Sequence, residues 1–220
     1  MSKIPGILVL LLALPVGATG QRPVATTSRN PVANPAAIVR AGHARFTVLT
    51  PRMIRMEWSG DDVFEDHASL VFLNRRLPVP AFRHATSHGW LTIRTDSLTL
   101  RYRPAGGRFD ATNLEVRRRL DGRDVVWRPG MPDTANLKGT ARTLDGAKGP
   151  IPLEDGLVSR AGWTVVDDSR RPLFDDSDPP WVLPRPDTTR IDWYFFGYGH
   201  DYAGALRDFT RVAGRIPMPP

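Results

Sequence analysis

The sequence predicts an all-β protein, an antiparallel β-sandwich with one C-terminal helix. Between residues 44 and 126, apolar and polar residues alternate repeatedly along short segments, which is typical of strands with one buried face. Glycine and proline separate these segments. Only one stretch, near the C-terminus, has apolar residues at helical spacing, and many short strands with one helix favour a sandwich.

The strand at 53–58 shows the alternation clearly. Ile54, Met56 and Trp58 point to one face, and Arg55 and Glu57 to the other, which we expect to be solvated. The segments 90–93 and 98–102 form a hairpin in this interpretation, because 94–97 reads as a turn. We predict further strands at 45–50, 69–73, 114–118, 124–127, 163–166 and 191–196.

A helix is predicted from about Tyr202 to Val212, with Asp201 as its N-cap and Gly214 after its end. Its apolar face consists of residues spaced three and four apart: Tyr202, Ala205, Leu206, Phe209 and Val212.

The N-terminus resembles a secretory leader. Lys3 precedes the uncharged apolar run 7–14, and small residues follow at 16–18 or 18–20. The run is shorter than the roughly 20 residues that a membrane span needs. We therefore assign 1–20 to a signal peptide, expect a secreted or periplasmic protein that does not bind membranes, and read 21–37, rich in Pro, Ala, Thr, Ser and Asn, as a flexible linker.

Composition excludes several classes of site. The chain has no cysteine, so it has neither disulfides nor thiolate metal ligands. Its net charge of +7 comes almost entirely from arginine. Because the arginines alternate with apolar residues, we expect them on solvated faces without a continuous patch, and we predict no nucleic-acid partner.

The acidic and histidine clusters do not resemble catalytic or metal sites. Asp167-Asp168 and 175–178 are adjacent acids in polar loops, whereas glycoside hydrolysis needs two carboxylates facing each other from separate elements. A weak calcium site there stays open, although the spacing is not that of an EF-hand. His84 and His88 lie in a loop pattern, and we predict no metal and no cofactor.

The polar loop 136–149 is the strongest candidate for a binding role. Arg142 and Asp145 lie between glycines there, and such a pair can orient a loop or bind sugar hydroxyls through charge-assisted hydrogen bonds. A purely structural Arg-Asp pair is the other interpretation, and the pattern alone favours it.

Several motifs resemble one family in their order along the chain. They are Asn136-Leu-Lys-Gly-Thr-Ala-Arg-Thr-Leu-Asp145, Pro152-Leu-Glu-Asp-Gly156, Gly156-Leu-Val-Ser-Arg-Ala-Gly-Trp-Thr-Val-Val-Asp-Asp168 and Asp192-Trp-Tyr-Phe-Phe-Gly-Tyr-Gly-His-Asp-Tyr202. With the closing Gly-Arg-Ile-Pro-Met-Pro-Pro, they look like the N-terminal β-sandwich of glycoside hydrolase family 31, in the stretch that leads into the catalytic (β/α)8 barrel.

The resemblance implies a galactose-mutarotase-like sandwich over 38–220, with the barrel beyond residue 220. In the family, a loop of this domain reaches over the barrel mouth, and its substrate-binding aspartate corresponds to Asp145, with Arg142 as the orienting partner. Both catalytic aspartates lie in the barrel. The resemblance therefore implies an α-linked oligosaccharide or glycoside as ligand, a barrel as partner, no catalytic residue in this chain and no hydrolysis by the chain alone.

Two functions from different classes follow from these observations. The first is a non-catalytic domain of a secreted α-glycosidase, which supports the barrel and contributes a loop to the substrate pocket. The alternative is a stand-alone carbohydrate-binding module that uses Trp163, Trp181 or Trp193 as sugar platforms. Exposed, coplanar indoles favour the module, whereas buried indoles belong to the core.

Overall fold

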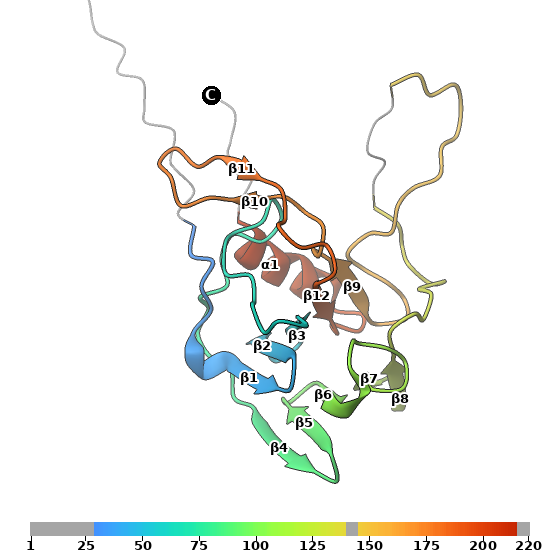
Figure 1. Cartoon of the computed structure of the whole chain (residues 1–220). Coiled ribbons are helices and arrows are strands. Elements are labelled where there is room, and N and C mark those ends of the chain that lie inside the picture. The colour runs from blue at the N-terminus through green and yellow to red at the C-terminus, as the bar shows by residue number, and fades with distance from the viewer. Residues whose placement is uncertain (1–28, 140–144, 215–220) are drawn as a thin grey trace, which may run out of the picture.

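A computed structural model describes residues 29–139 and 145–214 (Figure 1). Two five-stranded antiparallel sheets form a sandwich, and the described chain also contains a two-stranded ribbon and one α-helix. We call the sheet with the order β1-β2-β3-β12-β9 the central sheet and the sheet with the order β4-β5-β6-β7-β8 the outer sheet. The predicted all-β sandwich with a C-terminal helix is confirmed.

The central sheet combines the two ends of the described chain. Its strands are β1 (Ile38–Ala41), β2 (Ala44–Thr50), β3 (Met53–Trp58), β9 (Thr164–Asp167) and β12 (Ile191–Phe196). Strand β12 inserts between β3 and β9, with Ile191 opposite Trp58 and Phe196 opposite both Met53 and Thr164. The early hairpin β2-β3 thus reaches β9 only through the last strand.

The outer sheet is a simple meander of strands that are adjacent in sequence. Its strands are β4 (Arg83–Ser87), β5 (Trp90–Arg94), β6 (Thr99–Tyr102), β7 (Leu114–Leu120) and β8 (Arg123–Trp127). Two of its turns have two residues with positive φ, His88-Gly89 (50° and 77°) and Asp121-Gly122 (50° and 78°). This is the backbone of tight hairpin turns, where glycine and aspartate are favoured.

The main core lies between the two sheets. Phe46, Ile54 and Phe195 of the central sheet face Leu100 and Val116 of the outer sheet, all nearly inaccessible to solvent. Full burial of one such side chain stabilises the fold by roughly 1.5–3 kcal/mol. The alternation read from the sequence therefore predicts this face correctly.

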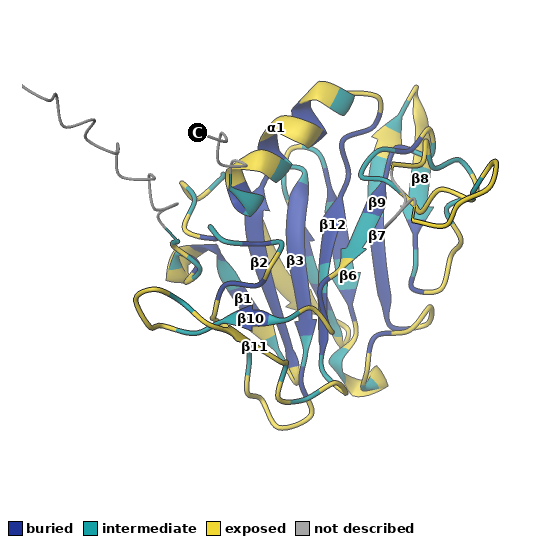
Figure 2. Ribbon diagram, turned by 90° about the horizontal axis from the view of Figure 1, so that it is seen from above, coloured by how far each residue is buried: buried dark blue, intermediate teal, exposed yellow. Residues whose placement is uncertain are grey.

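A second, smaller core covers the opposite face of the central sheet. Tyr194 stacks on Phe72, with ring centroids 3.5 Å apart, and Phe196 packs near Phe209 of helix α1 (Tyr202–Ala213). In Figure 2 the middle strands β2, β3 and β12 of the central sheet are mostly dark blue, and the outward side of α1 is exposed. These three strands are thus buried on both faces, whereas the edge strands β1 and β9 are only partly buried.

The helix begins and ends where the sequence predicts. The Asp201 side chain accepts a hydrogen bond from the Gly204 amide at 2.9 Å, and Gly214 follows the last turn with a φ of 85°. Of the predicted apolar face, Ala205 and Val212 are buried, but the Leu206 side chain is 53% exposed. No helix in the described ranges has the length and apolar character that crossing a bilayer requires.

The predicted strand at 69–73 is wrong. This segment makes one isolated bridge, Ser69 with Leu173, and its other amides bond to loops and the helix end: Leu70 to the Pro172 carbonyl, and Leu73 to the Val212 carbonyl. Phe72 and Val71 pack into the second core instead of pairing in a sheet, and Leu70 is exposed. The short strands β10 (Leu173–Phe174) and β11 (Val182–Leu183) form the ribbon beside it.

The expectation that Arg55 and Glu57 lie on a solvated face is also wrong. Both are buried, as is Arg45, because the segments 59–77 and 168–190 cover this face of the central sheet. The charges are satisfied in a row: Arg45 Nε donates to Glu57 at 2.6 Å, and Arg55 Nε donates to Asp192 at 2.7 Å. Removing one partner of such a buried ion pair leaves an uncompensated charge in the interior and strongly destabilises the fold.

Residues 29–37, assigned above to the linker, contact the domain. The Asn30 amide donates to the Leu73 carbonyl, and the Arg75 amide donates to the Asn30 carbonyl. The Arg29 guanidinium lies 5.2 Å from the Phe174 ring centroid. Pro35–Ala37 form a 3-10 turn that Asn34 caps. The predicted signal peptide and residues 21–28 lie outside the described residues.

The arginines of the outer sheet lie closer together than the sequence predicts. Strand pairing sets Arg83 opposite Arg94, and Thr99 of β6 opposite both Arg94 and Arg117. Directly opposed residues share a face, so these arginines form a row across the outer sheet. The expectation that they form no patch is therefore wrong, although the face is solvated as predicted.

Candidate functional site

The loop that the sequence singles out is held at its base by Asn136. The Asn136 amide nitrogen donates to Asp133 Oδ2 at 2.9 Å and to the Gly156 carbonyl at 3.1 Å. Its amide oxygen accepts from the backbone amides of Lys138 and Gly156, both at 2.8 Å. One side chain thus ties both ends of the loop together.

Other contacts close the two arms of the loop over the next residues. Lys138 forms an ion pair with Asp155, and the Gly139 amide donates to the Glu154 carbonyl at 3.1 Å. At Gly156, a Cβ atom would lie 2.6 Å from the Lys138 carbonyl oxygen. The arms approach so closely that only glycine fits there.

The loop stands away from the sandwich beyond these contacts (Figure 1). Asp145 lies in this outer part and is exposed, directly before Gly146, which has a φ of 72°. Arg142 lies outside the described residues, so the predicted Arg142–Asp145 pair stays a prediction. Asp145 is therefore exposed on a loop whose base the Asn136 side chain holds together.

A groove of about 740 Å³ opens beside the loop base. Its apolar wall includes the three indoles Trp127, Trp163 and Trp193, and its polar rim includes carboxylate, amide and guanidinium groups. The rim residues are Asp133, Asn136, Asp155, Asp167 and Arg171. An apolar wall with a few polar groups is typical of ligand sites and of contacts between domains.

The groove runs past a free sheet edge. Within the described ranges, β9 pairs only with β12, so its other edge has unpaired backbone groups. Such an edge accepts a further strand or is covered by another part of a protein. The groove and this edge together offer a surface for a second polypeptide segment.

The tryptophans do not form the platform that a stand-alone module needs. Trp163 is 7% exposed and Trp127 is 4% exposed, and the Trp127 ring packs 5.3 Å from that of Phe195 in the core. Trp193 is half-buried against the same core. Trp181 alone of the three candidates is well exposed, at 70%, on the β10-β11 ribbon.

The acidic clusters serve the fold. Asp168 is fully buried, where it accepts hydrogen bonds from Ser69 Oγ at 3.0 Å and Arg185 at 2.8 Å. Burial and the nearby charge of Asp192 raise the pKa of Asp168 to about 6, although Arg185 opposes this. Asp175 instead accepts from Ser177 and from the Trp181 amide within its own loop.

Asp192 shows the opposite balance. Burial works against its ionisation, but Arg55 and Arg185 outweigh that effect and hold the pKa of Asp192 well below its usual value. Asp168 and Asp192 share Arg185, so they brace one loop and do not face each other across an open cleft. No group of His, Asp and Glu side chains in the described ranges could hold a metal ion.

Sequence reasoning identified the loop but missed the groove. Asp133, Asp155 and Trp127 line the groove, but the sequence pattern singles out none of them. Their positions follow from the pairing of Asn136 with Ser159 and from the edge position of β9, neither of which is visible in a local pattern. The Asx turn at Asp133, whose carboxylate accepts from Ala135, is the one local signal.

Comparison with known proteins gives a limited result. No protein-family model and no curated protein matches the chain. Among solved structures, the chain is similar to a glycoside hydrolase family 31 dextranase of Flavobacterium johnsoniae complexed with glucose, with a TM-score of 0.46 and 12% identity over 82% of this chain. A mutant of that dextranase complexed with isomaltotriose gives a TM-score of 0.47 and 14% identity over the same share. The chain covers 27% of each of those longer chains, and we draw no functional conclusion from a similarity of this extent.

Proposed function

We propose that this chain is the N-terminal, non-catalytic sandwich of a secreted α-glycosidase, which supports a catalytic barrel and contributes the 136–149 loop to the substrate pocket. The proposal rests first on the family-like motifs of the sequence. The observation that carries it in the structure is the loop itself, which Asn136 anchors at its base, which stands away from the sandwich (Figure 1) and on which Asp145 is exposed. A loop built in this way suits contact with something outside the sandwich.

The groove beside the loop fits the same proposal. Its apolar lining, in which Trp193 is the half-buried indole, and the free edge of β9 supply apolar area and unpaired backbone groups for a neighbouring domain. In this proposal, Asp145 hydrogen-bonds sugar hydroxyls of an α-linked oligosaccharide in the barrel mouth, and Arg142 orients it. The predicted leader at 1–20 exports the protein, to the periplasm or the medium.

The first experiment is to sequence the DNA that follows the Pro220 codon. An open frame encoding a barrel with two acidic catalytic residues supports the proposal, and unrelated sequence contradicts it. The chain of 220 residues is then assayed alone on α-linked glucosides, including isomaltotriose, where we expect no hydrolysis. In the complete enzyme, Asp145→Ala should raise KM with little loss of stability, because Asp145 is exposed.

The stand-alone module keeps one observation in its favour, the exposed Trp181. If the chain is such a module, calorimetry should detect binding of isomaltotriose or a longer α-glucan, and Trp181→Ala should abolish it. Binding that survives this substitution would assign the sugar contact elsewhere. Absence of binding by the isolated chain agrees with the non-catalytic domain, whose pocket is completed by the barrel.

A further inference from the structure

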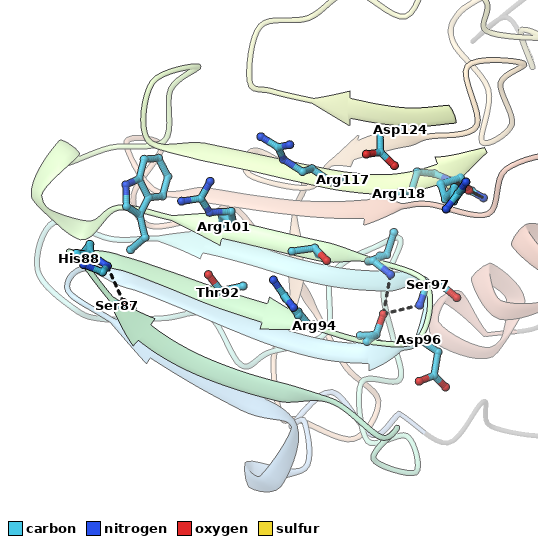
Figure 3. A pocket seen from close by; sticks show the side chains of 15 residues that line it. Ser87, His88, Thr92, Arg94, Asp96, Ser97, Arg101, Arg117, Arg118 and Asp124 are labelled. Atoms are coloured by element: carbon cyan, nitrogen blue, oxygen red, sulfur yellow. Dashed lines mark hydrogen bonds between the residues drawn. The ribbon is translucent and has the colours of Figure 1, made fainter. Parts of the chain in front are cut away.

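The exposed face of the outer sheet carries a concentration of arginine. Alternation and strand pairing place several arginines on this face. Each of the five strands contributes at least one arginine, either from the strand itself or from the residue directly after it. These arginines are Arg83, Arg94, Arg101, Arg103, Arg117, Arg119 and Arg128. The carboxylates of Glu115 and Asp124 lie between them, and Asp96 lines the larger depression at the turn after Arg94. Figure 3 shows Arg94, Arg101 and Arg117 on neighbouring strands of this face.

The positive charge of this face is only partly neutralised. Glu115 serves three arginines at once: Arg128 at 2.7 Å, Arg117 at 2.9 Å and Arg101 at 3.4 Å. Within the described ranges, no ion pair reaches Arg83, Arg94, Arg103 or Arg119. Each guanidinium has five N–H donors, so the face retains a large capacity to bind oxyanions.

The face is also hollowed. One depression of about 660 Å³ runs over β5, β6 and β7, between Arg94, Arg101 and Arg117. A second, of about 360 Å³, continues towards Arg128 and shares Trp90, Arg101 and Arg117 with the first. The hydroxyls of Thr92 and Thr99 line the first depression between the arginines, where they can bond neutral hydroxyl groups.

We propose that this face binds an anionic polysaccharide, a chain of sugars carrying carboxylate or sulfate groups, laid across the strands. The row through Arg83, Arg94 and Arg117 runs perpendicular to the strands. Because neighbouring strands are about 4.8 Å apart, Arg94 and Arg117 lie roughly 10 Å apart, on either side of Thr99. A linear polymer with repeated charges can therefore contact several guanidinium groups at once, with sugar hydroxyls over the threonines.

Other occupants fit this face less well. A second copy of the chain brings the same positive charge and is repelled. The residues outside the described ranges include no Asp or Glu, so none of these segments can neutralise the face. Single-stranded nucleic acid needs exposed aromatic rings for base stacking, but the Trp90 ring already lies under the guanidinium groups of Arg101 at 4.7 Å and Arg103 at 5.4 Å.

This inference uses neither Asp145 nor a barrel, so it can fail or hold independently of the proposed function. The test measures binding of the chain to heparin, which is sulfated, and to polygalacturonate, which is carboxylated, with dextran as the neutral control. Wild type should bind both polyanions and not dextran. The double variant Arg94→Gln, Arg117→Gln should bind roughly tenfold more weakly, with a salt slope lower by about 2.

The matched control removes the same charge from other faces. Arg76 and Arg207 are exposed, and within the described ranges no ion pair reaches either of them, so the double variant Arg76→Gln, Arg207→Gln should bind like wild type. In the opposite direction, Asp124→Asn should strengthen binding, because it removes an exposed negative charge from the face. Circular dichroism confirms that each variant is folded.

Three results overturn the proposal. The first is no binding to either polyanion, and the second is equal weakening by both double variants, which shows attraction to net charge alone. The third is duplex DNA displacing heparin at a lower concentration than polygalacturonate does, which assigns the face to nucleic acid. Loss of binding in the Arg94, Arg117 variant only, for sulfated or carboxylated sugars, supports it.

Discussion

The Asn136 clamp allows a quantitative prediction about the loop that carries Asp145. Asn136→Ala removes four hydrogen bonds, two to Gly156 and one each to Asp133 and Lys138. A hydrogen bond contributes about 1 kcal/mol net. Asn136 is only half-buried, so water replaces some of these bonds, and we expect a net loss of about 2 kcal/mol for closing the loop base.

A loss of this size raises the population of the open loop about 30-fold. Amide hydrogen exchange measures it at the Leu137 and Gly139 amides, which donate across the loop base to the Val158 and Glu154 carbonyls and keep these acceptors in the variant. Both should exchange about 30 times faster in Asn136→Ala, whereas amides of β5 and β6 should be unchanged. Lys138→Ala is the control, since its ion pair with Asp155 is about half exposed and such pairs contribute less than about 1 kcal/mol.

Lys138→Ala accelerating exchange at Gly139 as much as Asn136→Ala does would contradict this prediction. That result would mean that the outer ion pair, and not the amide clamp, closes the loop. Uniform acceleration across the sandwich would contradict it in another way, because Asn136 would then stabilise the whole domain. Only a local effect agrees with the geometry.

Three further predictions concern the same loop base and the buried charges. Gly156→Ala should force the loop arms apart, since its Cβ would lie 2.6 Å from the Lys138 carbonyl oxygen; faster exchange of the Lys138 amide tests this, and unchanged exchange contradicts it. Arg55→Met leaves the buried carboxylates of Glu57 and Asp192 without their main cation, so it should lower the free energy of unfolding in urea by about 3–5 kcal/mol. The control Arg52→Met removes a partly exposed ion pair with Asp201 and should lower it by less than about 1 kcal/mol. Equal losses in the two variants would show that burial of the ion pair is irrelevant. Burial raises the pKa of Asp168 to about 6, above the unfolded value of about 3.9, so the folded state binds this proton more tightly, and the stabilisation is complete below about pH 4 and lost as pH rises through 6. Up to about 3 kcal/mol of such pH dependence should be present in wild type and absent in Asp168→Asn, and parallel pH curves for the two would contradict the assignment.

The sheets were predictable where one local pattern decides the structure. Alternation gave the strand at 53–58, and Asp201 with Gly214 gave the helix ends. Alternation predicts the wrong environment for the polar residues Arg55 and Glu57 of the same strand. The pattern alone does not distinguish a polar face in solvent from a polar face that another segment covers. Arg55 is covered by segment 59–77 and by Asp192, which lies 137 residues further along the chain, and alternation within the strand reports neither contact.

The candidate site was predictable only as a loop. The glycines and polar residues marked 136–149, but the role of Asn136 as a clamp depends on Gly156 lying beside it. The groove forms where Trp127 of the outer sheet meets β9, with the adjoining Trp163, at the edge of the central sheet. The arginine row likewise follows from strand register, which a count of charges along the chain does not contain.

The position of β12 has a consequence for how the protein is made. This strand fills the place between β3 and β9, and it pairs with residues synthesised well over 100 positions earlier. During translation, the outer meander can form from neighbours in sequence, but the central sheet stays open until residues 191–196 leave the ribosome. Contacts so distant along the chain slow folding, so we expect the β2-β3 hairpin to wait, unpaired on one edge, and the central sheet to close in one late step.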